Sequence, residues 1–112
     1  MTDKELLELA AKAAGIDGKY TDAFGGDYYD CRNLSQGIET KDGELWNPLD
    51  FSDDALNLAV DLSIYIHPEF MENEVMTVIR GGRRFHETHG KDKRAATRRA
   101  IVIAAAAIGA KP

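Results

Sequence analysis

The chain has 112 residues, of which 44% are hydrophobic and 29% are charged, and these ordinary globular values argue against a disordered chain or a membrane protein. Its length predicts one domain, residues 1–112, with a core of its own. The single cysteine, Cys31, excludes an internal disulfide and a multi-cysteine zinc site, so we expect a reducing compartment and no cofactor or metal.

The first residues predict an amphipathic helix over Asp3–Ala14. Thr2 and Glu5 have the spacing of a capping box, in which the Thr2 hydroxyl accepts a hydrogen bond from the Glu5 N–H and the Glu5 carboxylate accepts one from the Thr2 N–H. Apolar residues then recur on one helical face, and Gly15 can take the left-handed conformation that ends a helix.

Glycines divide residues 16–46 into short stretches that predict strands and loops. The clearest signal is Asp42-Gly43, which favours a two-residue hairpin turn between strands over Gln36–Lys41 and Glu44–Trp46. This register would place Lys41 opposite Glu44 as a favourable cross-strand pair.

A second helix is predicted from Asp53 to about Leu62, with Ser52 as its N-cap. Phe51 has the position of a hydrophobic staple onto Leu56. The alternation of apolar and polar residues over 62–67 then predicts a half-buried strand that Pro68 terminates.

Two further elements complete the chain. A hairpin joins Glu74–Arg80 to Arg83–Thr88 through Gly81-Gly82, and counting back from that loop pairs Arg80 with Arg83. Asp92 caps a last helix that runs to about Ile108. The element order predicts an α/β fold of the α+β type, a single-domain layered sandwich in which a mostly antiparallel sheet is packed by three helices.

Charge is distributed unevenly along the chain, whose net charge is −5. Residues 1–70 carry 5 Lys/Arg and 15 Asp/Glu, whereas residues 71–112 carry 9 and 4. The asymmetry favours a charged partner, head-to-tail self-association, or a fold in which one face neutralises another. The basic residues gather in the second hairpin and the last helix, and a candidate contact for an anion or nucleic acid comprises Arg80, Gly81, Gly82, Arg83, Arg84, Arg94 and Arg98.

The last helix has no polar face in its second half, because every residue from Ala100 to Ile108 is apolar. Such a surface must be covered, either by a second copy of the chain or by another element of the same fold. The candidate oligomer interface comprises Ile103, Ala106 and Ala107, which implies a possible homodimer.

Four stretches of the chain carry a resemblance to a known family. They are Leu6–Gly15, Trp46–Leu49, Asp53–Val60 and Arg94–Val102. Together they resemble the phage αβα-sandwich domain family of small uncharacterised phage and prophage proteins. The resemblance implies a compact layered α/β domain of phage or prophage origin, and it implies no activity or catalytic residue. On physical grounds we expect Trp46 to be a core residue and Asn47 to bond its own turn.

Catalytic motifs are absent from the sequence: it contains no phosphate-loop lysine motif, no dinucleotide glycine fingerprint and no nucleophile elbow. His86 and His89 lack the helical spacing that would let them share a zinc ion. An enzyme would need distant groups, such as Asp30, His67 and His86, to converge. We therefore expect a non-enzymatic module that binds a protein partner, with anion or nucleic-acid binding as the alternative. No targeting signal or membrane span is recognisable, which favours the host bacterial cytoplasm.

Overall fold

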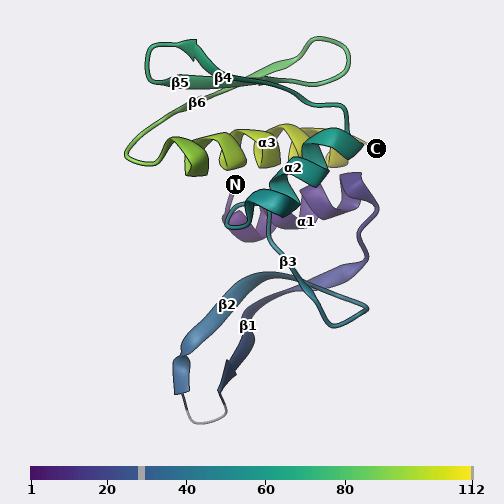
Figure 1. Cartoon of the computed structure of the whole chain (residues 1–112). Helices are drawn as coiled ribbons and strands as arrows, with labels where there is room; N and C mark the ends of the chain where they lie inside the picture. Colours follow the sequence, from purple (N-terminus) through teal and green to yellow (C-terminus); the bar gives the residue numbers. More distant parts are fainter. Residues whose placement is uncertain (28–29, 112) are drawn as a thin grey trace.

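The computed structural model describes residues 1–27 and 30–111 (Figure 1). The chain order is α1 (Asp3–Ala14), β1 (Gly18–Asp27), β2 (Asp30–Thr40), β3 (Leu45–Trp46), α2 (Ser52–Asp61), β4 (Tyr65–Met71), β5 (Glu74–Val78), β6 (Arg84–Thr88) and α3 (Lys93–Gly109). The strands pair only antiparallel within these ranges. The predicted α+β class with three helices is thereby confirmed. The side chains of Asp30 and Cys31 lie outside the described part of the chain.

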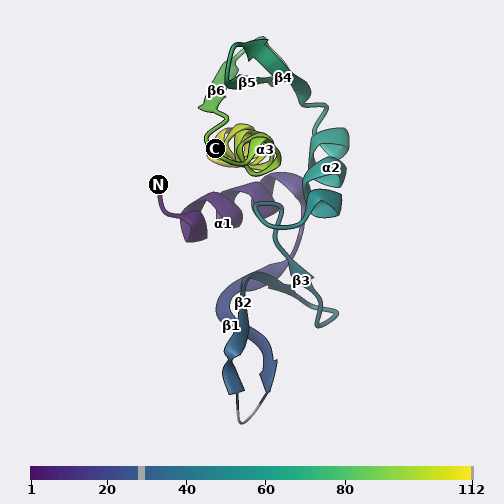
Figure 2. The ribbon, with the colours of Figure 1, turned by 60° about the vertical axis from the view of Figure 1, so that its left-hand side comes forward.

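The helices form a layer between two sheets (Figure 1). The strands do not make one sheet: β1, β2 and β3 form one sheet in that order, and β4, β5 and β6 form the other. Figure 2 shows α3 nearly end-on, with the β4–β6 sheet above it, α1 below it and α2 beside it. The β1–β2 ribbon leads away from the helices (Figures 1 and 2). Sheets therefore form the outer layers.

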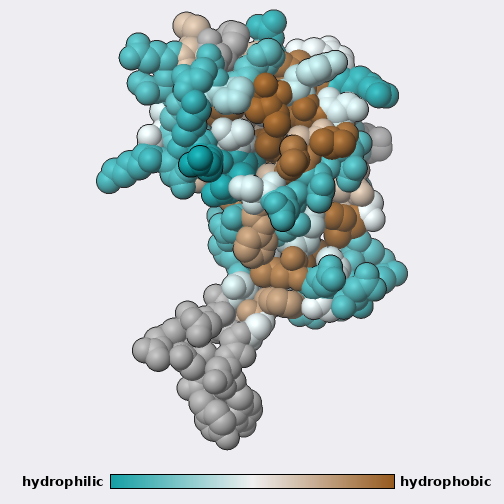
Figure 3. Space-filling model, in the orientation of Figure 1, coloured by the Kyte–Doolittle hydropathy of each residue, from teal (hydrophilic) through white to brown (hydrophobic). Residues whose placement is uncertain are grey.

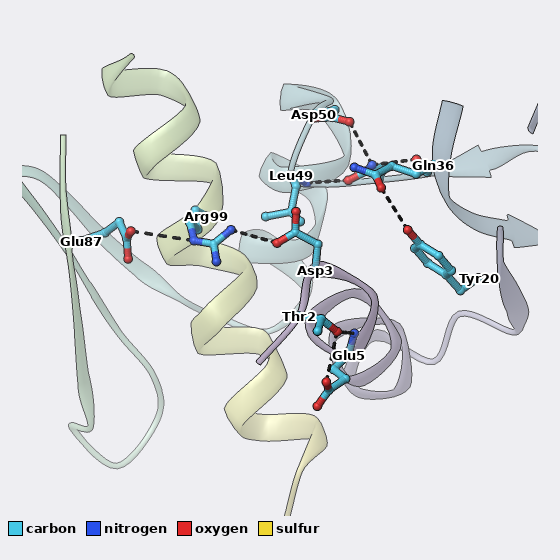
Figure 4. A network of polar contacts seen from close by, with 10 residues as sticks. Thr2, Asp3, Glu5, Tyr20, Gln36, Leu49, Asp50, Glu87 and Arg99 are labelled. Carbon is cyan, nitrogen blue, oxygen red and sulfur yellow. Dashed lines mark hydrogen bonds and ion pairs between the residues drawn. The ribbon is translucent and has the colours of Figure 1, made fainter. Parts of the chain in front are cut away.

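Helix α1 has the predicted bounds because its caps are local. The Thr2 Oγ1 accepts from the Glu5 N–H at 3.2 Å, and Gly15 ends the helix at φ 72°. The Glu5 carboxylate, however, accepts from the Thr2 hydroxyl at 3.1 Å rather than from its N–H (Figure 4). One half of the predicted capping box is thus correct, and the other uses a different donor.

Helix α3 is the central element of the core. The Asp92 carboxylate caps it by accepting from the N–H groups of Arg94 and Ala95, as predicted. Its small side chains allow α1 to approach closely: a Cβ on Gly109 would lie 2.0 Å from the Leu9 carbonyl oxygen. Gly109 is the last residue of the helix, one residue beyond the predicted end, and this close packing requires a glycine there. On its other side, the Thr77 hydroxyl of β5 donates to the Ala100 carbonyl at 3.1 Å.

The start of α2 differs from the prediction. Phe51 is the N-cap and contributes no side-chain hydrogen bond, whereas Ser52 is already helical. The Ser52 hydroxyl instead accepts from the Arg98 guanidinium at 3.2 Å. Phe51 and Leu56 are 44% and 60% exposed, so the predicted hydrophobic staple does not bury either side chain.

Both predicted hairpins are present, but each is shifted by one residue. Thr40 pairs with Glu44 through the Thr40 N–H, so the loop has three residues and Lys41 does not face Glu44. Lys41 forms an ion pair with Asp17 instead, at 2.6 Å. The loop ends at Gly43, with φ 80°, as expected for a type I turn followed by a left-handed glycine.

The second hairpin also has a three-residue loop, but Gly81 takes a positive φ of 99° there, so its turn is not the type I turn of the first hairpin. The Ile79 N–H donates to the Arg83 carbonyl at 3.0 Å, and Val78 pairs with Arg84. Arg80 therefore lies in the loop with Gly81 and Gly82, and the predicted opposition of Arg80 and Arg83 is wrong. The side chains of β6 consequently change faces relative to the prediction, because neighbouring residues of a strand point to opposite sides.

Strand β4 begins later and ends later than predicted. Ser63 takes a left-handed φ of 55°, and the Ile64 N–H donates to the Ala59 carbonyl, so residues 62–64 close the end of α2. Pro68 lies inside β4 rather than after it. The strand tolerates proline because β4 is an edge strand whose pairing with β5 is irregular after His67. No helix among the described residues is long and apolar enough to cross a membrane.

Candidate functional site: a groove between α2, α3 and β4

A groove of about 480 Å³ lies between α2, α3 and β4. Figure 3 shows apolar side chains gathered on this face of the molecule, bordered by hydrophilic ones. The groove is lined by Ser52, Ala55, Leu56, Ile66, Pro68, Lys93, Arg94, Thr97, Arg98 and Ile101. It thus combines an apolar floor with three cationic side chains, and no acidic side chain is among the described residues that line it.

The apolar part comes from all three elements. Ala55 of α2 and Ile101 of α3 are 2% and 3% exposed and form the floor. Ile66 of β4 is half-buried against the same core. Leu56 lies at the edge with 60% of its surface exposed. An exposed leucine beside a hollow apolar surface is typical of a binding site.

Arg98 fixes the position of α2 relative to α3. Its Nε donates to the Leu49 carbonyl at 2.9 Å and its Nη1 to the Ser52 hydroxyl, which fastens the loop before α2 onto α3. Both acceptors are uncharged, so the positive charge of Arg98 is not neutralised by them. Arg98, which the sequence predicts as an anion contact, therefore also holds the two helices of the groove together.

Asn47 anchors the same loop. It is 1% exposed, and its Oδ1 accepts from the Leu49 N–H at 2.9 Å, while its Nδ2 donates to the Gln36 carbonyl at 2.8 Å. Its own N–H donates to the Asp54 carboxylate at 2.9 Å. Trp46 beside it is 8% exposed and belongs to the main core. The expectations for Trp46 and Asn47 are both confirmed.

The other wall depends on contacts between β4 and the start of α3. Lys93 forms an ion pair with Glu69, and this hydrogen bond, aided by the charge of Lys93, lowers the pKa of the Glu69 carboxyl below its ordinary value. His89, which is 9% exposed, contacts the Pro68 carbonyl through Nε2 at 2.6 Å. Arg94 is exposed and has no carboxylate within ion-pair distance among the described residues. Arg94 is thus the cation of the groove that a partner can reach without displacing another contact.

The basic residues singled out in the sequence do not form one surface. Arg80 lies near Ile108 and Lys111, at the end of α3, whereas Arg94 lies in its first turn. At 1.5 Å per residue, Arg94 and Ile108 are about 21 Å apart along the helix. Arg99 belongs to neither group, because it pairs with Asp3 at 3.1 Å and Glu87 at 3.8 Å (Figure 4).

The tip of the second hairpin keeps its arginines exposed. Arg80, Gly81, Gly82, Arg83 and Arg84 are all exposed. The Arg83 guanidinium lies over the Phe85 ring, 5.0 Å from its centroid. None of these arginines has a carboxylate within ion-pair distance in the described part of the chain.

The apolar half of α3 is largely covered within the chain. Ala106 is 1% exposed, and Ile103 is half-buried against the main core. Ala107 is also half-buried. Cover by other elements, one of the two alternatives from the sequence, therefore accounts for Ala106. Self-association through Ile103 and Ala107 stays a prediction.

The two histidines named as candidate catalytic groups lie on one sheet, and the side chain of the third candidate, Asp30, lies outside the described part of the chain. His86 contacts the Glu74 carboxylate through Nδ1 at 2.5 Å. His67 and His86 both pair with Met76 of β5, so they flank it on the same face of the sheet. Asp30 belongs to the other sheet. Among the described residues, no group of three or more His, Cys, Asp or Glu side chains is placed to hold a metal ion.

Comparisons of the chain with family models, curated proteins and solved structures give no match. The sequence predicts a binding role for Arg94 and Arg98, but it does not predict the groove that they line. The residues of the groove come from three separate segments of the chain. The local sequence hints at the groove only on α2, where the apolar residue Leu56 follows Ala55.

Proposed function

We propose that this protein is a non-enzymatic binding module that takes up a segment of a partner protein in the groove between α2, α3 and β4. The observation that carries the proposal is the pairing of a hollow apolar floor with an exposed leucine, Leu56, and an exposed arginine, Arg94. Binding sites for peptides combine apolar anchors with a few polar groups that fix orientation. The proposal includes a phage or prophage origin, as the sequence resemblance implies, and a role as an accessory protein in the bacterial cytoplasm.

A peptide selection tests this function without knowledge of the partner. A library of random peptides of about 16 residues, long enough for four helical turns, is selected on the wild-type protein, on Leu56→Glu and on Val60→Glu. Val60 is a matched control, because it is one turn along α2 and 68% exposed but does not line the groove. We expect enrichment on the wild type and Val60→Glu, and none on Leu56→Glu. Enrichment that survives Leu56→Glu, or none on any protein, contradicts the proposed function.

The hairpin tip supports a second candidate function, anion or nucleic-acid binding. Its support is the exposure of three arginines without carboxylate partners among the described residues, at a loop whose glycines allow close approach of a phosphate. Retention of duplex DNA or RNA on nitrocellulose is the measurement. Binding should weaken steeply with added salt and be lost in Arg83→Ala/Arg84→Ala. Retention that persists in this double variant contradicts the second candidate.

A further inference from the structure

We infer that the partner segment is an acidic amphipathic helix, whose apolar side packs on the floor of the groove and whose carboxylates meet Arg94 and Lys93. The inference rests on the proposed function and adds the chemistry of the partner. The charged side chains that line the groove are all positive, so the partner segment should be acidic.

The first step is charge complementarity. The groove lining holds Lys93, Arg94 and Arg98 and, within the described residues, no carboxylate. Glu69 pairs with Lys93 from outside the lining. A basic segment would be repelled by Arg94, whereas an acidic segment would be attracted to it. Arg94 also lies within residues 71–112, where Lys and Arg outnumber Asp and Glu.

The second step is the geometry of the lining. The α3 residues of the groove recur at helical spacing over Lys93, Arg94, Thr97, Arg98 and Ile101. At 1.5 Å per residue they extend over about 12 Å, or two turns. A helix with anchors at i, i+4 and i+7 covers a similar length along one face. The volume of about 480 Å³ leaves room for a few leucine-sized side chains.

The third step is the arrangement of polar and apolar groups. The apolar floor lies at Ala55, Ile66 and Ile101, whereas Lys93 and Arg94 occupy the first turn of α3. Lys93 and Arg94 are thus separated from the floor, whereas Arg98 between them bonds Leu49 and Ser52, so an occupant needs an apolar side over the floor and an acidic side over Lys93 and Arg94. Lys93 is already paired with Glu69, so a carboxylate of the partner must displace Glu69 to bind it. Arg94 is exposed, and a partner carboxylate can bind it without displacing another group.

Three synthetic peptides test the inference by fluorescence anisotropy. The first has leucines at i, i+3, i+4 and i+7 and glutamates between them, the second carries lysines in place of the glutamates, and the third has the composition of the first in scrambled order. We expect only the first to bind the wild-type protein. Arg94→Glu should weaken it at least about tenfold, and Arg84→Glu, an exposed arginine on β6 outside the groove, should leave its affinity unchanged.

Each other outcome overturns the inference in a recognisable way. Equal binding of the scrambled peptide excludes a helix, and preferred binding of the lysine peptide excludes acidic chemistry. In both cases the proposed function survives if Leu56→Glu abolishes binding. Binding of a long-chain fatty acid alone, lost in Leu56→Glu, assigns the groove to a lipid and overturns both proposals, as does binding of the first peptide that neither Leu56→Glu nor Arg94→Glu changes.

Discussion

Leu56 of α2 and Arg94 of α3 line one groove although they belong to helices that are separated in the chain by all of the β4–β6 sheet. Both side chains are exposed. Their positions are held by Arg98, which fastens the loop before α2 onto α3, and by Lys93, which pairs with Glu69 of β4. The groove is therefore built by polar contacts at its rim rather than by the core alone.

Glu69→Gln should strengthen binding of the acidic amphipathic peptide by about twofold to fivefold. The substitution removes the carboxylate that competes with the peptide for Lys93, and the gain is small because an exposed ion pair is weak. The measurement is the peptide affinity of the two proteins at the same ionic strength. Glu72→Gln, at an exposed turn residue outside the groove lining, is the control. Weaker binding by Glu69→Gln would show that Glu69 supports the occupant instead of competing with it.

The ion pair between Glu69 and Lys93 also gives stability a defined pH dependence. Because folding lowers the pKa of Glu69 below 4.5, the contribution of this group is present above pH 4.5 and is lost as pH falls through the lowered value. The difference in unfolding free energy between the wild type and Glu69→Gln should therefore shrink in that acidic range and stay constant above it. Urea titrations at a series of pH values measure it. A difference that grows on acidification contradicts this assignment.

Asn47→Ala should lower the unfolding free energy by roughly 2–4 kcal/mol. The side chain is 1% exposed and bonds the backbone of Leu49 and Gln36, so its removal leaves two partly buried backbone groups without this partner and opens a small cavity. Asn57→Ala is the matched control, because Asn57 is exposed on α2, and its effect should stay within about 0.5 kcal/mol. Urea denaturation compares the two variants. Equal stability of both would show that Asn47 does not hold the loop.

Gly109→Ala should destabilise the fold by about 1–3 kcal/mol. Alanine is the better helix former by about 1 kcal/mol, yet its Cβ would lie 2.0 Å from the Leu9 carbonyl oxygen. The helices α1 and α3 must therefore separate or tilt. Thermal denaturation gives the sign of the change, and a higher Tm than that of the wild type would mean that the two helices do not approach so closely.

The sequence predicts those features of the fold that depend on neighbouring residues. The N-caps at Thr2 and Asp92 and the turn bonds of Asn47 are formed within a few residues, and all are confirmed. The local sequence predicts Ser52 as an N-cap, but its hydroxyl accepts from Arg98, a residue far along the chain. Long-range contacts of this kind have no local pattern.

The two hairpins show how a small local error has a large effect. Asp42-Gly43 and Gly81-Gly82 both mark turns, but each loop has a third residue, Lys41 or Arg80. A glycine that follows a type I turn and a glycine of a two-residue turn give the same signal in the sequence. The division into two sheets and the groove at α2, α3 and β4 depend on packing between distant segments, which neither turn nor periodicity records.

The most direct test of the binding groove is a map of the amide chemical shifts of the ¹⁵N-labelled protein while the acidic amphipathic peptide is added. We expect saturable shifts at Leu56, Ile66, Arg94 and Ile101, and none at the hairpin tip formed by Arg80, Gly81 and Gly82. Shifts confined to that tip or to the β1–β2 ribbon would contradict binding in the groove and place the binding surface elsewhere on the protein.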